Sequence, residues 1–256
     1  LTTYTTITTR IFMNLLAGLT TDNTIADASE AVSTGSVLTS NVYDFNVDLA
    51  YISKSSGGAI AINLHLSANG QTLRQTVYAS SGDAKGNKNF YTDRNGKKQY
   101  LPGFNVANNL ALLTAGKPLS ELVPEEKVAN LYDYDAGKEL PTKIAALTEI
   151  MGKPVSAGII KQTVDKRAKT DSGEYEATGE TRDENEIDRL FRTSDGLTVT
   201  EIKAAATDPA IKTAWLKKNF EVTKMKAKGA VTGAVAGMPA AAAQSIPSLF
   251  GNVANA

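Results

Sequence analysis

The stretch QTLRQTVYASSGDAKGNKNFYTDRNGKKQYLPGF, residues 71–104, combines a strand pattern, a cationic loop and aromatic residues more densely than any other part of the chain. Its first part alternates polar and apolar side chains, which is the period of a strand with one buried and one solvent-facing side. Leu73 and Val77 fall on the side predicted to be buried, whereas Arg74 and Tyr78 fall on the other side. We therefore expect the exposed side of this strand to form part of a binding surface.

The loop that follows this strand brings cations and aromatic rings together. Residues 71–104 hold six Lys or Arg residues against two carboxylates, and an Asn-Gly pair at residues 95–96 predicts a tight turn. Cations neutralise phosphates and rings stack on bases, so this combination favours single-stranded nucleic-acid binding. The candidate binding residues here are Arg74, Tyr78, Lys85, Lys88, Phe90, Tyr91, Arg94, Lys97, Lys98 and Tyr100. A loop with this many cations can also be an ordinary solvent-exposed surface. Phe104 can be a core residue or a ring on which a base stacks.

Composition narrows the function classes. The chain has 256 residues, 42% of them hydrophobic, and its 27 Lys and Arg residues balance 27 Asp and Glu residues. The sequence has no cysteine, which excludes disulfides, thiolate metal sites and cysteine nucleophiles and fits an intracellular protein. The single histidine, His65, lies in an alternating run, where we expect a strand residue rather than a metal ligand. We expect neither a signal peptide nor a membrane span, which also fits an intracellular location.

Hydrophobic periodicity predicts a sheet with helical insertions. Alternating residues 42–51, 59–67 and 72–79, joined by turns at 55–58 and 69–70, predict a three-stranded antiparallel meander. The remaining elements that we expect are helices over 106–115 and 119–130, a strand or helix over 141–150, a buried strand over 155–164, sheet-closing patches at 187–191 and 197–202, and helical structure over 208–228.

Charge segregates along the second half of the chain. A second basic cluster contributes the candidate binding residues Lys153, Lys161, Lys166 and Arg167. Residues 171–189 then hold eight carboxylates against two Arg residues, which predicts a solvated loop, and we hypothesise that this loop occupies the cationic groove when DNA is absent. A third basic stretch, which carries Trp215 and Phe220, is followed by the uncharged, Gly- and Ala-rich residues 229–256.

These patterns divide the chain into four parts. We expect an N-terminal helix and linker over residues 1–40, a nucleic-acid-binding domain over 41–205, a basic C-terminal helix over 206–228 and a flexible tail over 229–256. Within the tail, Phe250 is a candidate apolar docking residue.

Catalytic motifs find little support in the sequence. The four Gly-Lys pairs, which end at residues 97, 117, 138 and 153, lack the glycine spacing and the following hydroxyl residue of a phosphate-binding loop, and no Gly-x-Ser-x-Gly elbow occurs. Candidate metal-binding carboxylates such as Asp44 and Glu125 have no distinguishing spacing. We therefore expect a binding protein without a cofactor or metal, not an enzyme.

Short strands, tight turns, a helical insertion and two basic clusters suit an OB-type barrel. Three segments, LRQTVYASSGDAKGNKNFYTDRNGKKQYLPGF, ELPTKIAALTEIMGKPV and GEYEATGETRDENEIDRLF, also resemble the OB-fold single-stranded DNA-binding proteins of tailed bacteriophages. The resemblance covers residues 41–202. It implies a mainly β, OB-fold-like antiparallel barrel with a helical insertion and flanking helices. It also implies sequence-independent coating of single-stranded DNA during phage replication and recombination.

The chain departs from that family in its uncharged C-terminal residues, and its sequence also fits two other functions. Many single-strand binders end in an acidic tail that recruits partners, whereas this chain ends uncharged. The Thr-rich start and the Ala- and Gly-rich end also fit a structural or assembly protein of a virion, which would self-associate and ignore DNA. An RNA-binding OB protein is the third possibility, because stacking and phosphate contacts alone do not read the 2′-hydroxyl.

Overall fold

The computed structural model describes residues 37–133, 136–170 and 175–228. All of them belong to the larger of two compact units, which begins at Gly35. Its strands are β1 (Asn41–Lys54), β2 (Ile60–Ala68), β3 (Gln71–Tyr78), β4 (Phe90–Thr92), β5 (Lys98–Tyr100), β6 (Glu125–Asp133), β7 (Lys138–Ala146), β8 (Pro154–Lys169), β9 (Tyr175–Phe191) and β10 (Thr223–Met225). Its helices are α1 (Pro102–Thr114), α2 (Val199–Lys203) and α3 (Ala210–Asn219), with short 3₁₀ turns η1 (Asp83–Lys85) and η2 (Leu119–Glu121). This part of the chain is mainly β, as predicted.

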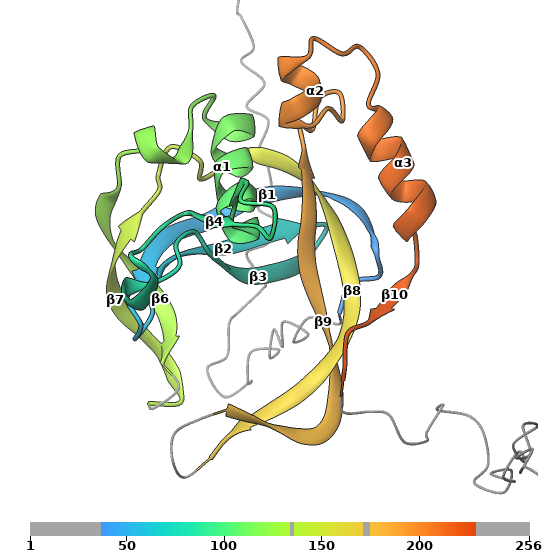
Figure 1. Cartoon of the computed structure of the whole chain (residues 1–256). Helices are drawn as coiled ribbons and strands as arrows, with labels where there is room; N and C mark the ends of the chain where they lie inside the picture. The colour runs from blue at the N-terminus through green and yellow to red at the C-terminus, as the bar shows by residue number, and fades with distance from the viewer. Residues whose placement is uncertain (1–36, 134–135, 171–174, 229–256) are drawn as a thin grey trace, which may run out of the picture. The chain divides into compact units, whose positions relative to one another are not determined.

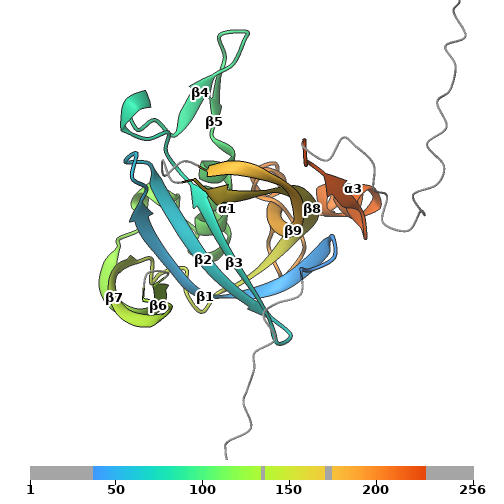
Figure 2. The same ribbon diagram turned by 90° about the horizontal axis from the view of Figure 1, so that it is seen from below.

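One twisted sheet of eight strands organises the domain. Strands β3, β2, β1, β8 and β9 are neighbours in that order, and all of these pairs are antiparallel (Figures 1 and 2). Strand β1 is shared, because its first half pairs with β8 while its second half pairs with β2 and briefly with β7. Strand β7 continues the sheet to β6, and β10 pairs in parallel with β8. Strands β4 and β5 form a separate small hairpin.

The meander β1–β2–β3 confirms the predicted alternation. Leu73 and Val77 are buried, whereas Arg74 and Tyr78 are exposed. The turn between β2 and β3 uses Asn69 and Gly70 with positive φ values of 48° and 77°, which is the conformation that an Asn-Gly hairpin turn prefers.

Strands β3 and β9, the two ends of the order β3-β2-β1-β8-β9, approach each other without forming a ladder. The Ile187 backbone N–H on β9 donates a hydrogen bond of 2.9 Å to the side-chain oxygen of Gln75 on β3. No backbone pairing between β3 and β9 occurs among the described residues, so backbone hydrogen bonds do not close the sheet into a barrel there.

The main core lies between the curved sheet and α1. Phe45, Leu64 and Ile159 from the sheet and Ala107 and Leu110 from α1 belong to one buried cluster. A second, smaller cluster joins Ile160 and Phe191 to Trp215 on α3. No helix in the described ranges has both the length and the apolar character that crossing a bilayer requires.

Helix α1 begins four residues before its predicted start, and its first turn touches β3. Pro102 occupies the first turn, where its missing N–H costs no hydrogen bond. A Cβ atom on Gly103 would lie 2.3 Å from the Tyr78 carbonyl oxygen. The backbones of α1 and β3 can approach this closely only because residue 103 has no side chain.

We expect Gly103→Ala to lower the free energy of unfolding by about 1–3 kcal/mol, since the added methyl group must push α1 away from β3. Urea denaturation followed by circular dichroism measures this loss. Asn105→Ala, a change at an exposed position in the same turn, is the matched control and should leave the free energy of unfolding nearly unchanged. Equal stability of Gly103→Ala and the wild type would contradict the close approach.

Three sequence-based predictions are wrong. Residues 119–130 form η2 and most of β6 rather than a helix, because pairing with β7 overrides the helical propensity of the Glu, Lys and Ala residues. The acidic residues 175–189 belong to β9 rather than a loop. Residues 199–202 lie in α2 rather than the sheet, because Thr198 and Glu201 form a capping box.

Two of the predicted domain boundaries fall within packed structure. Asn185 on β9 exchanges two hydrogen bonds of 2.8 Å with the Leu38 backbone, so the end of the predicted linker packs on the sheet. Residues 206–228 form helix α3 and then strand β10 of the same sheet. The predicted N-terminal helix and the predicted tail lie outside the described residues.

Candidate nucleic-acid interface

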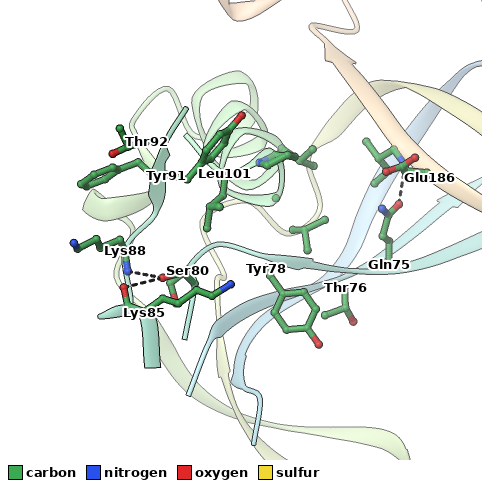
Figure 3. A pocket seen from close by; sticks show the side chains of 17 residues that line it. Gln75, Thr76, Tyr78, Ser80, Lys85, Lys88, Tyr91, Thr92, Leu101 and Glu186 are labelled. Atoms are coloured by element: carbon green, nitrogen blue, oxygen red, sulfur yellow. Dashed lines mark hydrogen bonds between the residues drawn. The ribbon is translucent and has the colours of Figure 1, made fainter. Parts of the chain in front are cut away.

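A groove of about 640 Å³ opens where the end of β3, the following loop, strand β4 and the start of α1 meet β9. We call it the β3–α1 groove. Five of the predicted binding residues line it, namely Tyr78, Lys85, Lys88, Phe90 and Tyr91. Figure 3 shows Tyr78 contributed by the sheet and Tyr91 by the separate hairpin.

The loop that carries the two lysines is held at both ends. Ser81 and Lys88 exchange hydrogen bonds, from the Ser81 N–H to the Lys88 carbonyl at 2.9 Å and from the Lys88 N–H to the Ser81 hydroxyl at 3.0 Å. The Asp83 N–H donates to the Gly57 carbonyl at 2.9 Å, which ties η1 to the β1–β2 turn. Lys85 therefore extends from a fixed backbone.

Asp93 orders the turn of the β4–β5 hairpin. Its carboxylate accepts backbone hydrogen bonds of 2.9 Å from both Asn95 and Lys97. The hydrogen bond from the Lys97 backbone is the main cause of a lowered Asp93 pKa. Gly96 completes the turn with a φ of 78°, as the Asn-Gly pair predicts.

The lowered Asp93 pKa predicts how the hairpin responds to acid. A carboxylate whose pKa is depressed by folding stabilises the folded form above its ordinary pKa, and this contribution is lost as the pH falls through the folded value. We expect the Lys97 amide resonance to titrate with a midpoint below about 3.9, the ordinary value for aspartate, as measured by NMR. Asp93→Asn should remove this titration. A midpoint at or above the ordinary value would contradict the hydrogen bonds.

The aromatic residues of this region differ in whether their rings contact a neighbouring ring or cation. Tyr78 and Tyr91 are 52% and 49% exposed. The centres of the Tyr100 and Phe104 rings are 4.9 Å apart, and the Lys98 ammonium lies 4.9 Å from the centre of the Phe90 ring. Tyr100 is 57% exposed, but only Tyr78 and Tyr91 among these three tyrosines line the β3–α1 groove, so these two rings are best placed to receive a base there. Phe104 itself packs against the main core, as one of the two alternatives predicted.

The cations of the loop and hairpin have no carboxylate partner among the described residues. Within the described ranges, no ion pair to a carboxylate forms at the five cationic side chains of the loop and hairpin, which are Lys85, Lys88, Arg94, Lys97 and Lys98. Their positive charge stays available to an anionic ligand. Arg94, Lys97 and Lys98 lie on the hairpin outside the groove lining.

The second basic cluster behaves differently. Lys161 pairs with Asp183 at 2.9 Å and Lys166 pairs with Glu180 at 2.7 Å, across the β8–β9 ladder. The pair with Lys166 lowers the pKa of Glu180, and a hydrogen bond from Thr163 together with the pair with Lys161 lowers the pKa of Asp183. The cations of β8 therefore compensate the acidic residues of β9.

The remaining candidates also lie away from the β3–α1 groove. Arg167 is exposed on β8, where it pairs with Ala177 of β9. The Lys153 carbonyl accepts a hydrogen bond from the Val47 N–H on β1. Val47 pairs with Leu66 of β2, which in turn pairs with Leu73 of β3. Lys153 therefore lies near the end of β3 that is far from Tyr78. Arg74 shares the exposed side of β3 and lies 3.9 Å from Glu139.

The described carboxylates of residues 175–189 do not occupy the groove as the autoinhibition hypothesis requires. Glu186 lines the groove, but its carboxylate accepts a hydrogen bond of 2.7 Å from Lys226. No carboxylate of this described stretch forms an ion pair with a cation of the loop or hairpin. The structure therefore contradicts the hypothesis for this stretch.

Sequence reasoning missed several polar residues of the groove. Thr76 shares the exposed side of β3 with Tyr78, so the alternation of the strand could have identified it. The hypothesis about the acidic run included Glu186 but did not single it out, because the run was predicted to be a loop and not strand β9. His65 lies edge-on to Tyr51, with 6.1 Å between ring centres, and burial together with Arg74 lowers its pKa. Among the described residues, no group of three His, Cys, Asp or Glu side chains could hold a metal.

Comparison with protein-family models, curated proteins and solved structures finds no match to this chain. The functional conclusion therefore depends on the groove itself.

Proposed function

We propose that this protein binds single-stranded DNA in the β3–α1 groove, stoichiometrically and without sequence specificity. The observation that carries the proposal is the meeting of two half-exposed rings, Tyr78 and Tyr91, with two unpaired cations, Lys85 and Lys88, in one groove. Bases stack on the rings while the cations neutralise phosphates, which is how sequence-independent single-strand binders work. Binding weakens as salt rises, because neutralised phosphates release their counterions.

The strand connectivity supports an OB-type barrel as the fold behind this function. The order β3-β2-β1-β8-β9, with α1 between β3 and β8, gives five main strands that curve around one core. The hydrogen bond between Gln75 and Ile187 lies where such a barrel would close. In OB-folds the face of the second and third strands binds oligonucleotides, and here that face carries Arg74 and Tyr78.

The biological setting is proposed from the sequence resemblance. A sequence-independent single-strand binder of a tailed phage coats template during replication and recombination in the host cytoplasm. Replication or recombination proteins are then its proposed partners, with the segment around Phe250 as the proposed anchor.

Removing one stacking ring tests the proposal. We expect Tyr91→Ala to weaken single-strand binding by about 1–3 kcal/mol, the range for one stacked base, without lowering the melting temperature. Fluorescence anisotropy with a labelled mixed-sequence oligonucleotide measures the affinity. Tyr78→Ala should act in the same direction.

Tyr175→Ala is the matched control, because Tyr175 is 63% exposed on β9 and lies outside the groove. Its affinity should equal that of the wild type. If Tyr91→Ala and Tyr175→Ala bind alike, Tyr91 does not stack on a base.

A further inference from the structure

A second groove of about 580 Å³ continues from the β3–α1 groove. Both grooves are lined by Tyr91, Pro102, Val106, Glu186 and Ile187, so one ligand can pass from the first into the second. The second groove lies between α1 and the end of β9 and reaches α2. We call it the amide groove, after the side chains described next.

Three carboxamide side chains line the amide groove, Gln99 from β5 and Asn105 and Asn109 from α1. Asn105 and Asn109 are four residues apart and therefore lie on one face of the helix. Neither side chain hydrogen-bonds to another described residue. Asn108 differs, because its oxygen accepts a hydrogen bond of 3.0 Å from the Leu119 N–H and so supports the fold. Two carboxamides on one helix face are thus available to a ligand.

The charges of the amide groove do not favour phosphate. Its only cation among the described lining residues is Arg189, which lies 3.9 Å from Asp188. Both lining carboxylates already accept hydrogen bonds, Asp188 from the Trp215 indole at 2.6 Å and Glu186 from Lys226 at 2.7 Å. A neutral ligand with hydrogen-bonding edges fits these surroundings better than an anion.

We propose that the amide groove binds nucleobases of the same strand whose phosphates are neutralised by Lys85 and Lys88. The inference rests on the proposed function. The strand passes Tyr91, and the edges of its next bases meet the carboxamides of Asn105 and Asn109. A carboxamide offers both donors and an acceptor, and a single strand exposes the corresponding groups on every base. The contact therefore requires a base but does not select one.

An abasic oligonucleotide separates base contacts from backbone contacts. Fluorescence anisotropy compares the affinity for a labelled mixed-sequence single strand with the affinity for an abasic strand of equal length. In the abasic strand, a tetrahydrofuran unit without a base replaces every nucleoside. We expect the double variant Asn105→Ala/Asn109→Ala to bind the base-containing strand about tenfold more weakly than the wild type, since two hydrogen-bonding side chains are lost. Its affinity for the abasic strand and the salt dependence of binding should be unchanged.

Asn130→Ala, an exposed asparagine on β6, is the matched control and should bind like the wild type. Asn105→Ala alone, at an exposed position, should give about a threefold loss and guards against misfolding of the double variant. An unchanged affinity of the double variant for the base-containing strand, or an equal loss on both strands, would overturn the inference. If the wild type binds neither strand, the proposed function fails instead.

Discussion

Reversing both groove lysines, in Lys85→Glu/Lys88→Glu, should weaken single-strand binding about a hundredfold at low salt. Both side chains line the groove and neither is paired with a described carboxylate, so each is free to neutralise a phosphate. Reversal replaces two attractions with two repulsions. The slope of log affinity against log salt should also become shallower by about 0.7 for each lost phosphate contact. Fluorescence anisotropy across a series of salt concentrations measures both effects.

Lys153→Glu/Arg167→Glu is the control with the same change in net charge. Both residues are exposed cations outside the groove lining. We expect only a small loss of affinity, through the overall charge of the protein. Equal losses in the two double variants would mean that DNA responds to net charge and not to the groove.

The second large effect is on stability. Trp215→Ala should lower the free energy of unfolding by about 3–5 kcal/mol, the usual cost of truncating a buried aromatic residue. Trp215 is 7% exposed, packs with Ile160 and Phe191, and donates an indole hydrogen bond of 2.6 Å to Asp188. Its ring also lies 3.0 Å from where a Cβ atom would stand on Gly158 of β8. The side chain therefore fastens α3 to the sheet.

Urea denaturation measures this loss, with far-ultraviolet circular dichroism as the probe because Trp215 is the only tryptophan in the chain. Lys217→Ala, an exposed change on the same helix, should leave the free energy of unfolding within about 0.5 kcal/mol of the wild type. A loss below about 1 kcal/mol for Trp215→Ala would show that α3 does not depend on this ring.

Sequence patterns correctly predicted the elements whose structure is determined by residues close together in the chain. The alternation around Leu73 and Val77 and the turn at Asn69 define β2 and β3 within a short stretch of chain. Turn chemistry likewise predicted the tight turn at residues 95–96, which joins β4 to β5, but not which aromatic rings face the groove. Much of the groove is therefore readable from one stretch of sequence.

Distant pairings explain what the sequence did not reveal. The helix-favouring residues of β6 become a strand only because β7 pairs with them. The acidic residues of β9 become a strand because β8 supplies a ladder and the cations Lys161 and Lys166. These ion pairs occupy two of the four cations of the second basic cluster, which was a candidate from charge alone.

One equilibrium measurement tests single-strand binding by this protein most directly. Fluorescence anisotropy of a labelled mixed-sequence oligonucleotide, single-stranded and duplex, is followed as wild-type protein is added at low and at physiological salt. We predict tight binding of the single strand at low salt, clear preference over the duplex, and a steep loss of affinity as salt rises. Absence of single-strand binding at low salt would contradict the account and favour a self-associating structural protein.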